Sequence, residues 1–146
     1  RGWSDAATAR QAMDQMYQRC QIALPGLDDE CALHGEMDPA TAARRIADLG
    51  AGEICLKNGA GGCLLRHGGA VELMPARPDI TPLDTTAAGD SFNAAYLYHR
   101  LLGESAAEAA RAGHHLAAQV IQYPGAVIPK DAMPPPIEVS GDHCHE

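Results

Sequence analysis

The segment Asp84–Phe92 reads Asp-Thr-Thr-Ala-Ala-Gly-Asp-Ser-Phe, and it decides how the rest of the chain is interpreted. It leads into an apolar pattern from Ala88 to Leu102 that predicts a helix closed by Gly103. Small residues at the opening of a helix leave backbone N–H groups uncovered, and the helix dipole adds partial positive charge there. The segment therefore predicts an anion hole built from the amides of Ala88, Gly89 and their neighbours.

Asp90 stands at the same turn, where a carboxylate would repel a bound phosphate. One interpretation is that Asp90 acts as a general base, which accepts a hydroxyl proton while the nearby amides stabilise a transferring phosphoryl group. The other is that Asp90 caps the helix and that Gly89 eases a tight turn. The residues alone leave both interpretations open.

The rest of the chain alternates helical and strand patterns. We expect strands at residues 21–24, 53–57, 63–66 and 70–74, the last two joined as a hairpin through His67-Gly68-Gly69. We expect helices at residues 4–20, 40–49, 88–102 and 105–122, with a short helix opened by the acidic cluster 28–30. This order predicts an α/β fold with a partly parallel sheet.

Composition excludes several function classes. The 146 residues carry 11 Lys and Arg against 19 Asp and Glu, for a net charge of −8 without a basic stripe, so we expect no nucleic-acid or membrane partner. No apolar run approaches a membrane span and the first residues lack the pattern of a signal peptide, which indicates a cytoplasmic address.

The five cysteines form no CxxC pair, and we expect reduced thiols, including Cys55 and Cys63. The ligand-rich run Asp142–Glu146 lies on a polar tail and does not predict a metal site.

Two motifs carry a resemblance to a known family. Asp84–Asp90, with Ser91–Ala94 after it, resembles the C-terminal signature of the ribokinase-like (PfkB) carbohydrate kinases. Lys57–Gly62, which follows a strand, resembles that family's K-x-G-x-x-G turn along the nucleotide. Within the family the chain is most similar to kinases of 2-dehydro-3-deoxygluconate (KDG), through residues 27–30, 84–96, 113–114, 120–129 and 132–134.

The resemblance implies a three-layer ribokinase-like α/β fold, of which the chain is the C-terminal portion of a mostly parallel sheet flanked by helices. Residues 1–134 would form the nucleotide-binding and catalytic part, residues 135–146 a flexible polar tail, and the N-terminal half and lid would be missing. Arg1-Gly2-Trp3-Ser4 resembles the end of an arginine-rich segment, which places Arg1 midway through a full kinase.

The resemblance also implies residue roles. Asp90 would deprotonate the acceptor hydroxyl, with Arg1 as a further substrate-binding candidate. The implied anion hole comprises Ala87, Ala88 and Gly89, and the implied ATP-binding residues are Lys57, Asn58, Gly59, Ala60, Gly61, Gly62, Gly89 and His114. A core or surface histidine is the alternative for His114.

Metal ligands are implied at two places. Asp84 and Thr86, with the loop at Gly125, match the family's site for a monovalent cation such as K⁺. In the family's N-x-x-E motif, which organises Mg²⁺ through water, Gly26 replaces the asparagine and Asp29 the glutamate. The alternative for Asp29 is an acidic surface residue favoured by the helix dipole.

The implied activity is ATP- and Mg²⁺-dependent phosphorylation of KDG to its 6-phosphate. The alternatives are another sugar kinase of the family, for fructose or ribose, and a truncated nucleotide-binding module without activity. We expect this chain alone to be inactive. The expected partners are the sugar acid, ATP and a homo-oligomer formed through the missing lid.

Overall fold

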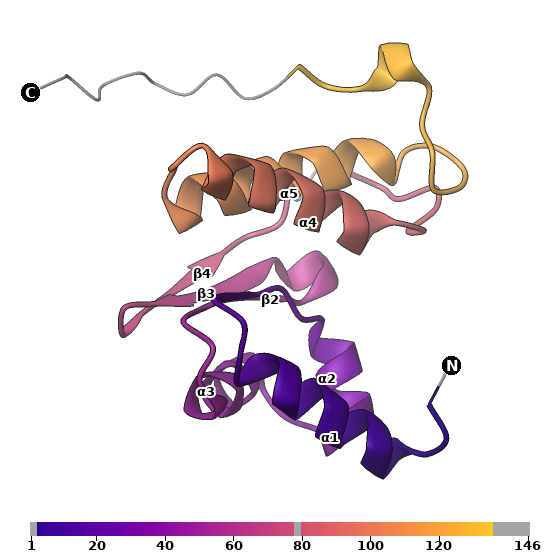
Figure 1. Ribbon diagram of the computed structural model, residues 1–146. Helices are drawn as coiled ribbons and strands as arrows, with labels where there is room; N and C mark the ends of the chain where they lie inside the picture. Colours follow the sequence, from indigo (N-terminus) through magenta and orange to yellow (C-terminus); the bar gives the residue numbers. More distant parts are fainter. Residues whose placement is uncertain (1–2, 78–79, 136–146) are drawn as a thin grey trace, which may run out of the picture. The chain divides into compact units, whose positions relative to one another are not determined.

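The computed structural model describes residues 3–77 and 80–135 (Figure 1). The chain divides into two compact units, a first unit at Arg1–Asp79 and a second unit at Ile80–Glu146. The first unit holds the whole described sheet, and the second holds a pair of long helices. The expectation of one part spanning residues 1–134 with a tail after it stays a prediction.

The sheet of the first unit has four strands in the order β1-β2-β3-β4. The strands are β1 (Ile22–Ala23), β2 (Glu53–Lys57), β3 (Cys63–His67) and β4 (Ala70–Met74). The partly parallel sheet predicted from the residues is confirmed, since β1 and β2 pair in parallel and β2–β3 and β3–β4 are antiparallel in the described residues, although this portion of the sheet is not mostly parallel. The reason is that a glycine-rich turn after β2 and the Gly68-Gly69 turn after β3 each reverse the chain, which confirms the hairpin.

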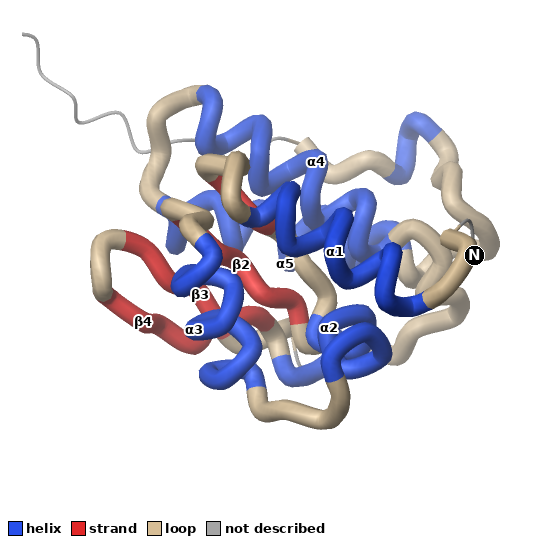
Figure 2. The backbone as a smooth tube through the Cα atoms, turned by 60° about the horizontal axis from the view of Figure 1, so that its bottom comes forward, coloured by secondary structure: helices blue, strands red, loops and turns tan. Residues whose placement is uncertain are grey.

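Three helices lie on one face of this sheet (Figures 1 and 2): α1 (Ala6–Tyr17), α2 (Leu27–His34) and α3 (Pro39–Leu49). The Asp5 carboxylate caps α1 by accepting the Thr8 N–H at 2.8 Å. The start of α3 at Asp38-Pro39 and its end at Gly50 are confirmed. A shared core, to which α3 contributes Ile46 and two alanines, holds α3 against the sheet.

A buried network of charged and polar groups joins the three helices, and sequence reasoning missed it. The carboxylate of Glu30, which is 1% exposed, accepts the Tyr17 hydroxyl at 2.6 Å and Arg45 Nη2 at 2.5 Å. Arg45 Nη1 also donates to Asp14 at 2.8 Å. Burial acts to lower the pKa of Arg45, but the hydrogen bonds to Asp14 and Glu30 outweigh it and raise that pKa.

The second unit is built on α4 (Ala88–Leu101) and α5 (Ala106–Val120), which pack against each other. The expected capping box of α5 is confirmed, since Ser105 and Glu108 each bond the other's backbone N–H. A Cβ on Gly113 would lie 2.8 Å from the ring of Phe92, so the glycine lets that ring pack directly on α5. None of the described helices is long and apolar enough to cross a membrane.

Candidate active site

The turn after β2 is fixed by its own backbone. The Asn58 N–H donates to the Gly62 carbonyl at 2.8 Å, across a 3-10 turn at Gly59–Gly61. Gly62 has a φ of 87°, and a Cβ there would lie 2.1 Å from the Met74 carbonyl oxygen. Only glycine fits this position, because the turn is pressed against the end of β4. The turn therefore presents Lys57 and its glycines in one backbone conformation.

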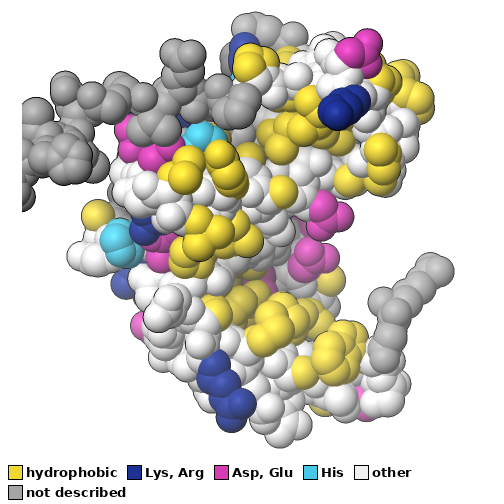
Figure 3. All heavy atoms as spheres, turned by 45° about the horizontal axis from the view of Figure 1, so that its top comes forward, with side chains coloured by type: hydrophobic (Ala, Val, Ile, Leu, Met, Phe, Trp, Pro, Cys, Tyr) yellow, Lys and Arg dark blue, Asp and Glu magenta, His cyan; other side chains and the backbone are white. Residues whose placement is uncertain are grey.

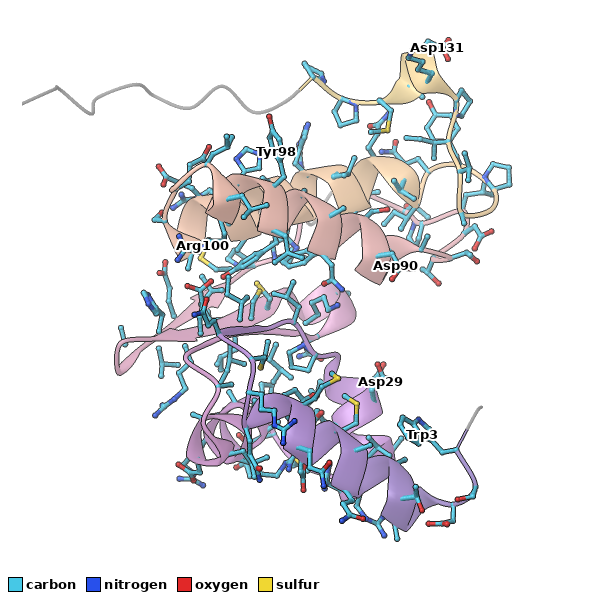
Figure 4. All side chains as sticks on the ribbon, in the orientation of Figure 1. Trp3, Asp29, Asp90, Tyr98, Arg100 and Asp131 are labelled. Carbon is cyan, nitrogen blue, oxygen red and sulfur yellow. The ribbon has the colours of Figure 1, made fainter. Side chains whose placement is uncertain are left out.

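The start of α2 lies beside this turn. The Lys57 N–H donates to the Pro25 carbonyl at 2.9 Å, and Gly26 forms a parallel bridge with Lys57. Asp29, in the first turn of α2, is exposed (Figure 4). The structure therefore brings the Mg²⁺ candidate and the nucleotide-binding candidate to the carboxyl ends of the parallel strands β1 and β2. Ligands of α/β proteins bind at this edge of a sheet.

Two buried thiols flank the turn. Cys55 on β2 and Cys63 on β3 are both reduced thiols and are fully buried. A hydrogen bond with Cys63 and burial together raise the pKa of the Cys55 thiol. A thiol with a raised pKa is a poor nucleophile, so this pair belongs to the packing beneath the turn.

The predicted anion hole opens α4 in the second unit. Ala87 is the N-cap residue and has a left-handed backbone with a φ of 61°, an unusual conformation for a residue other than glycine. The Ala88 N–H donates to the Thr85 carbonyl at 3.1 Å, so this amide is engaged. The amides of Gly89 and Asp90, within residues 80–135, have no backbone acceptor. The groups that offer N–H donors are therefore Gly89 and Asp90 rather than Ala88.

Asp90 is the third residue of α4 and is exposed at the start of that helix (Figure 4). The alternative in which its side chain caps the helix is wrong, since the N-cap is Ala87 and no side chain forms a capping hydrogen bond in this described stretch. The carboxylate thus stands in the first turn of α4, next to its own amide and that of Gly89. This places an acceptor for a proton beside donors for an anion.

Asp84 ties the loop to the end of α5. Its Oδ1 accepts the Thr86 N–H at 2.9 Å, and its Oδ2 accepts the Gly125 N–H at 2.8 Å. These bonds, led by one from the Thr86 side chain, lower the pKa of Asp84 to about 2. The structure therefore brings together Asp84, Thr86 and Gly125, the three positions of the implied cation site, and keeps the carboxylate charged.

His114 on α5 lies edge-on to Phe92, with ring centroids 5.0 Å apart. Its Nε2 is buried and has no hydrogen-bond partner among the residues that the structure describes. Such an atom is available to a ligand or a water. The implied role in nucleotide binding stays a prediction.

Arg1 and the run Asp142–Glu146 lie outside the described residues. Within residues 3–77 and 80–135, no group of three or more His, Cys, Asp or Glu side chains is placed to hold a metal ion. The candidate residues therefore form two groups, one around Lys57–Gly62 and Asp29 in the first unit and one around Asp84–Asp90 in the second.

Comparisons with known proteins agree on one family. The model of the pfkB family carbohydrate kinases matches residues 1–133. The 2-dehydro-3-deoxygluconokinase of Escherichia coli K12 is 43% identical over 139 residues, and that of Dickeya dadantii is 44% identical over 135 residues. Each match covers 90% of this chain and 44% of the relative, so the chain spans less than half the length of these relatives.

Solved structures agree on the fold. Ribokinase from Thermotoga maritima superposes with a TM-score of 0.72 and 27% identity, covering 89% of this chain and 44% of that one. Aminoimidazole riboside kinase from Salmonella enterica, complexed with aminoimidazole riboside and an ATP analog, gives 0.73 and 26%, covering 85% and 43%. The expected ribokinase-like α/β fold is therefore confirmed.

Proposed function

Since this chain belongs to the pfkB family of carbohydrate kinases, we propose that it carries the catalytic base and nucleotide-binding part of an ATP-dependent kinase for KDG. One observation supports the proposal above all: the Asp90 carboxylate shares the first turn of α4 with two amides that lack backbone acceptors. A phosphoryl transfer needs a proton acceptor and an anion stabiliser at one place.

In the proposed reaction, Asp90 takes the proton of the acceptor hydroxyl as its oxygen attacks the γ-phosphorus of ATP. The bond from that phosphorus to the bridging oxygen breaks, and ADP leaves. The amides of Gly89 and Asp90 stabilise the negative charge on the transferring group, helped by the dipole of α4. Ala87, with its left-handed backbone, precedes these amides as the N-cap of α4.

ATP would lie along Lys57–Gly62, with His114 as a further contact. The fixed turn supports this role, because Gly59, where nothing lies within 4 Å of an added Cβ, leaves the backbone open to a ligand. A kinase structure similar to this chain was solved with an ATP analog. The Lys57 side chain supplies a positive charge beside the phosphates in this proposal.

Mg²⁺ would be held through water by Asp29, and its chemistry would be to neutralise charge on the phosphates. The residues fit this ion in part: a carboxylate is exposed at the edge where Lys57 lies, but Gly26 supplies no side-chain ligand. For a monovalent cation, Asp84 supplies a charge that its low pKa preserves. Carbonyl oxygens near Thr86 and Gly125 would complete that site.

We propose KDG as the acceptor because relatives named for it share 43% and 44% identity over 90% of the chain. The product would be the 6-phosphate of KDG. A module without transfer activity is the second candidate, since Gly26 supplies no side-chain ligand for Mg²⁺. In this proposal the whole kinase binds the small-molecule partners and forms an oligomer through a lid.

The test is a coupled assay of ADP release with KDG, fructose and ribose as acceptors. It is run on this chain and on a chimera. The chimera joins this chain to the segment of the E. coli relative that the chain does not match, in the same order along the chain as in that relative. We expect activity with KDG in the chimera alone. Activity with another sugar would overturn the substrate, and a folded chimera that is silent with all three would favour the inactive module.

A further inference from the structure

The ring of Phe92 is buried close to the proposed catalytic base. Phe92 follows Asp90 by two residues on α4, and it is 3% exposed. Exposed apolar side chains gather in patches on the surface (Figure 3), but this ring contributes almost nothing to that surface. Successive residues of a helix point about 100° apart, so residues that are two positions apart point nearly opposite ways. The direction in which Phe92 is held therefore also sets the direction of Asp90.

Gly113, inside α5, provides the seat for this ring. A Cβ added to Gly113 would lie 2.8 Å from Cδ2 and Cε2 of Phe92 and 3.0 Å from its Cγ, which is closer than carbon atoms pack. Glycine is less favourable than alanine inside a helix, and Gly113 makes no turn there. The reason for a glycine at this position is therefore the room that it leaves for the ring.

Two further rings contact Phe92. Tyr96, one turn later on α4, stacks on it with ring centroids 6.0 Å apart. His114 on α5 meets it edge-on, with centroids 5.0 Å apart and an angle of 73° between the ring planes. Both arrangements are favourable for aromatic pairs. The Nε2 atom of His114 is buried and unpaired within residues 3–77 and 80–135, so the plane of this imidazole decides where that atom points.

The segment that carries the proposed base is attached at both of its ends. The Asp84 carboxylate accepts the Gly125 N–H at 2.8 Å and so ties the loop before α4 to the segment after α5. At the other end, the Phe92 ring lies on α5 itself. Gly89 and Asp90 stand between these two attachments. Such attachments matter for catalysis, since a misplacement of about 1 Å can lower a rate about 10²-fold.

We propose that Phe92 is a positioning residue for phosphoryl transfer: its ring, seated on Gly113, sets the direction in which α4 presents the Asp90 carboxylate. The same ring sets the plane of the His114 imidazole through its edge-on contact. The proposal rests on the proposed function, because it assigns to Phe92 the placement of the proposed base and of a proposed nucleotide contact. Phe92 itself touches neither the sugar acid nor ATP in this proposal.

Steady-state kinetics of the chimera test the first part. Gly113→Ala adds the Cβ that displaces the ring. Arg111→Gly, at an exposed position of α5, is the control that weakens the same helix without adding volume near the ring. Both are assayed at a temperature at which circular dichroism shows them folded. We expect Gly113→Ala to lower kcat for KDG about tenfold or more and Arg111→Gly to leave it unchanged. An unchanged kcat in Gly113→Ala, or equal falls in both variants, would overturn the proposal.

A second substitution covers the case in which Gly113→Ala does not fold. Phe92→Leu removes the ring and leaves space that the Cβ of Gly113→Ala can fill. We expect Phe92→Leu to lower kcat about tenfold and the double variant to lower it no further, because both changes act on one contact. Losses that multiply in the double variant, or a Phe92→Leu chimera with full kcat, would contradict the proposal.

NMR spectroscopy of the chain tests the second part without any activity. In the unaltered chain we expect NOE cross-peaks between the ring protons of Phe92 and His114, whose centroids lie 5.0 Å apart. Phe92→Leu should shift the ring signals of His114 and leave those of His67, on β3 of the first unit, in place. Missing cross-peaks, or His114 signals that do not respond to Phe92→Leu, would overturn this part.

The two measurements distinguish failure of this proposal from failure of the kinase function. An active chimera whose kcat does not respond to Gly113→Ala keeps the function and rejects the positioning role. A folded chimera without activity, together with shifted His114 signals in the chain, rejects the function and with it the role of Phe92 in transfer. That second outcome keeps the hold of the Phe92 ring on His114.

Discussion

The two groups of candidate residues are held in place by different means. In the first unit, the turn Lys57–Gly62 is fixed by close backbone contact, since Gly62 leaves no room for a Cβ against the Met74 carbonyl. In the second unit, the loop before α4 is held through hydrogen bonds in which the Asp84 carboxylate accepts the N–H groups of Thr86 and Gly125. Packing holds the first group and one charged acceptor holds the second.

This difference predicts which substitutions each group of candidate residues tolerates. Added volume disrupts a site held by close packing, because a packed core cannot yield without strain. Loss of charge disrupts a site held by a carboxylate, and added volume near exposed loop residues costs little. Acidic side chains of the two units differ in the same way, since Glu30 is buried in the first unit and Asp90 is exposed in the second.

The largest expected effect is that of Gly62→Ala. The added Cβ would lie 2.1 Å from the Met74 carbonyl oxygen at a φ of 87°, so the turn and β4 must separate. We expect a loss of about 4 kcal/mol or more in the free energy of unfolding, measured by urea denaturation. Gly59→Ala is the matched control: its φ is also positive, at 48°, but nothing lies within 4 Å, and we expect a loss of about 1 kcal/mol. Equal losses would show that packing does not fix this turn.

The next effect is that of Glu30→Ala. This change leaves Arg45 and the Tyr17 hydroxyl without their buried acceptor and loosens the contact of α1, α2 and α3. We expect a loss of about 3 kcal/mol, measured by thermal unfolding. Glu36→Ala, at an exposed glutamate, should change stability by less than about 0.5 kcal/mol. A loss of similar size at both positions would remove the contrast between buried and exposed acids.

The smallest effect concerns Asp84 and pH. Its pKa is lowered from about 3.8 to about 2, so its contribution is complete above about pH 4 and is lost as the pH falls through about 2. The NMR signal of the Gly125 amide, which donates to this carboxylate, should therefore shift with a midpoint near pH 2. The same signal in Asp84→Asn should show no such step. A midpoint near pH 4 in the unaltered chain would mean that the hydrogen bonds do not hold the loop.

Local signals in the sequence predicted much of the fold. Asp38-Pro39 and Gly50 marked the ends of α3, and Ser105 with Glu108 marked the start of α5, because caps depend on residues three or four positions apart. The hairpin at Gly68-Gly69 was predicted for the same reason. The resemblance of Asp84–Asp90 and Lys57–Gly62 to a kinase family pointed to both candidate groups and to the family that the comparisons confirm.

Other features depend on contacts that sequence patterns do not record. Glu30 read as part of an acidic first turn, but its partners Tyr17 and Arg45 lie 13 and 15 residues away along the chain. The hydrogen bond from the Ala88 N–H to the Thr85 carbonyl follows from the left-handed backbone of Ala87. Small residues permit this backbone conformation but do not require it. The parallel or antiparallel pairing of strands likewise depends on the turns between them as well as on strand patterns.

Replacement of Asp90 by asparagine tests the central claim most directly. In the chimera with the E. coli segment, Asp90→Asn keeps the shape of the side chain and removes its ability to take a proton. We expect kcat for KDG to fall by about 10³-fold while the Kd for ATP stays the same, with Asp131→Asn, at an exposed position in the same unit, unaffected. Retained activity in Asp90→Asn, or a loss matched by lost ATP binding, would contradict the account.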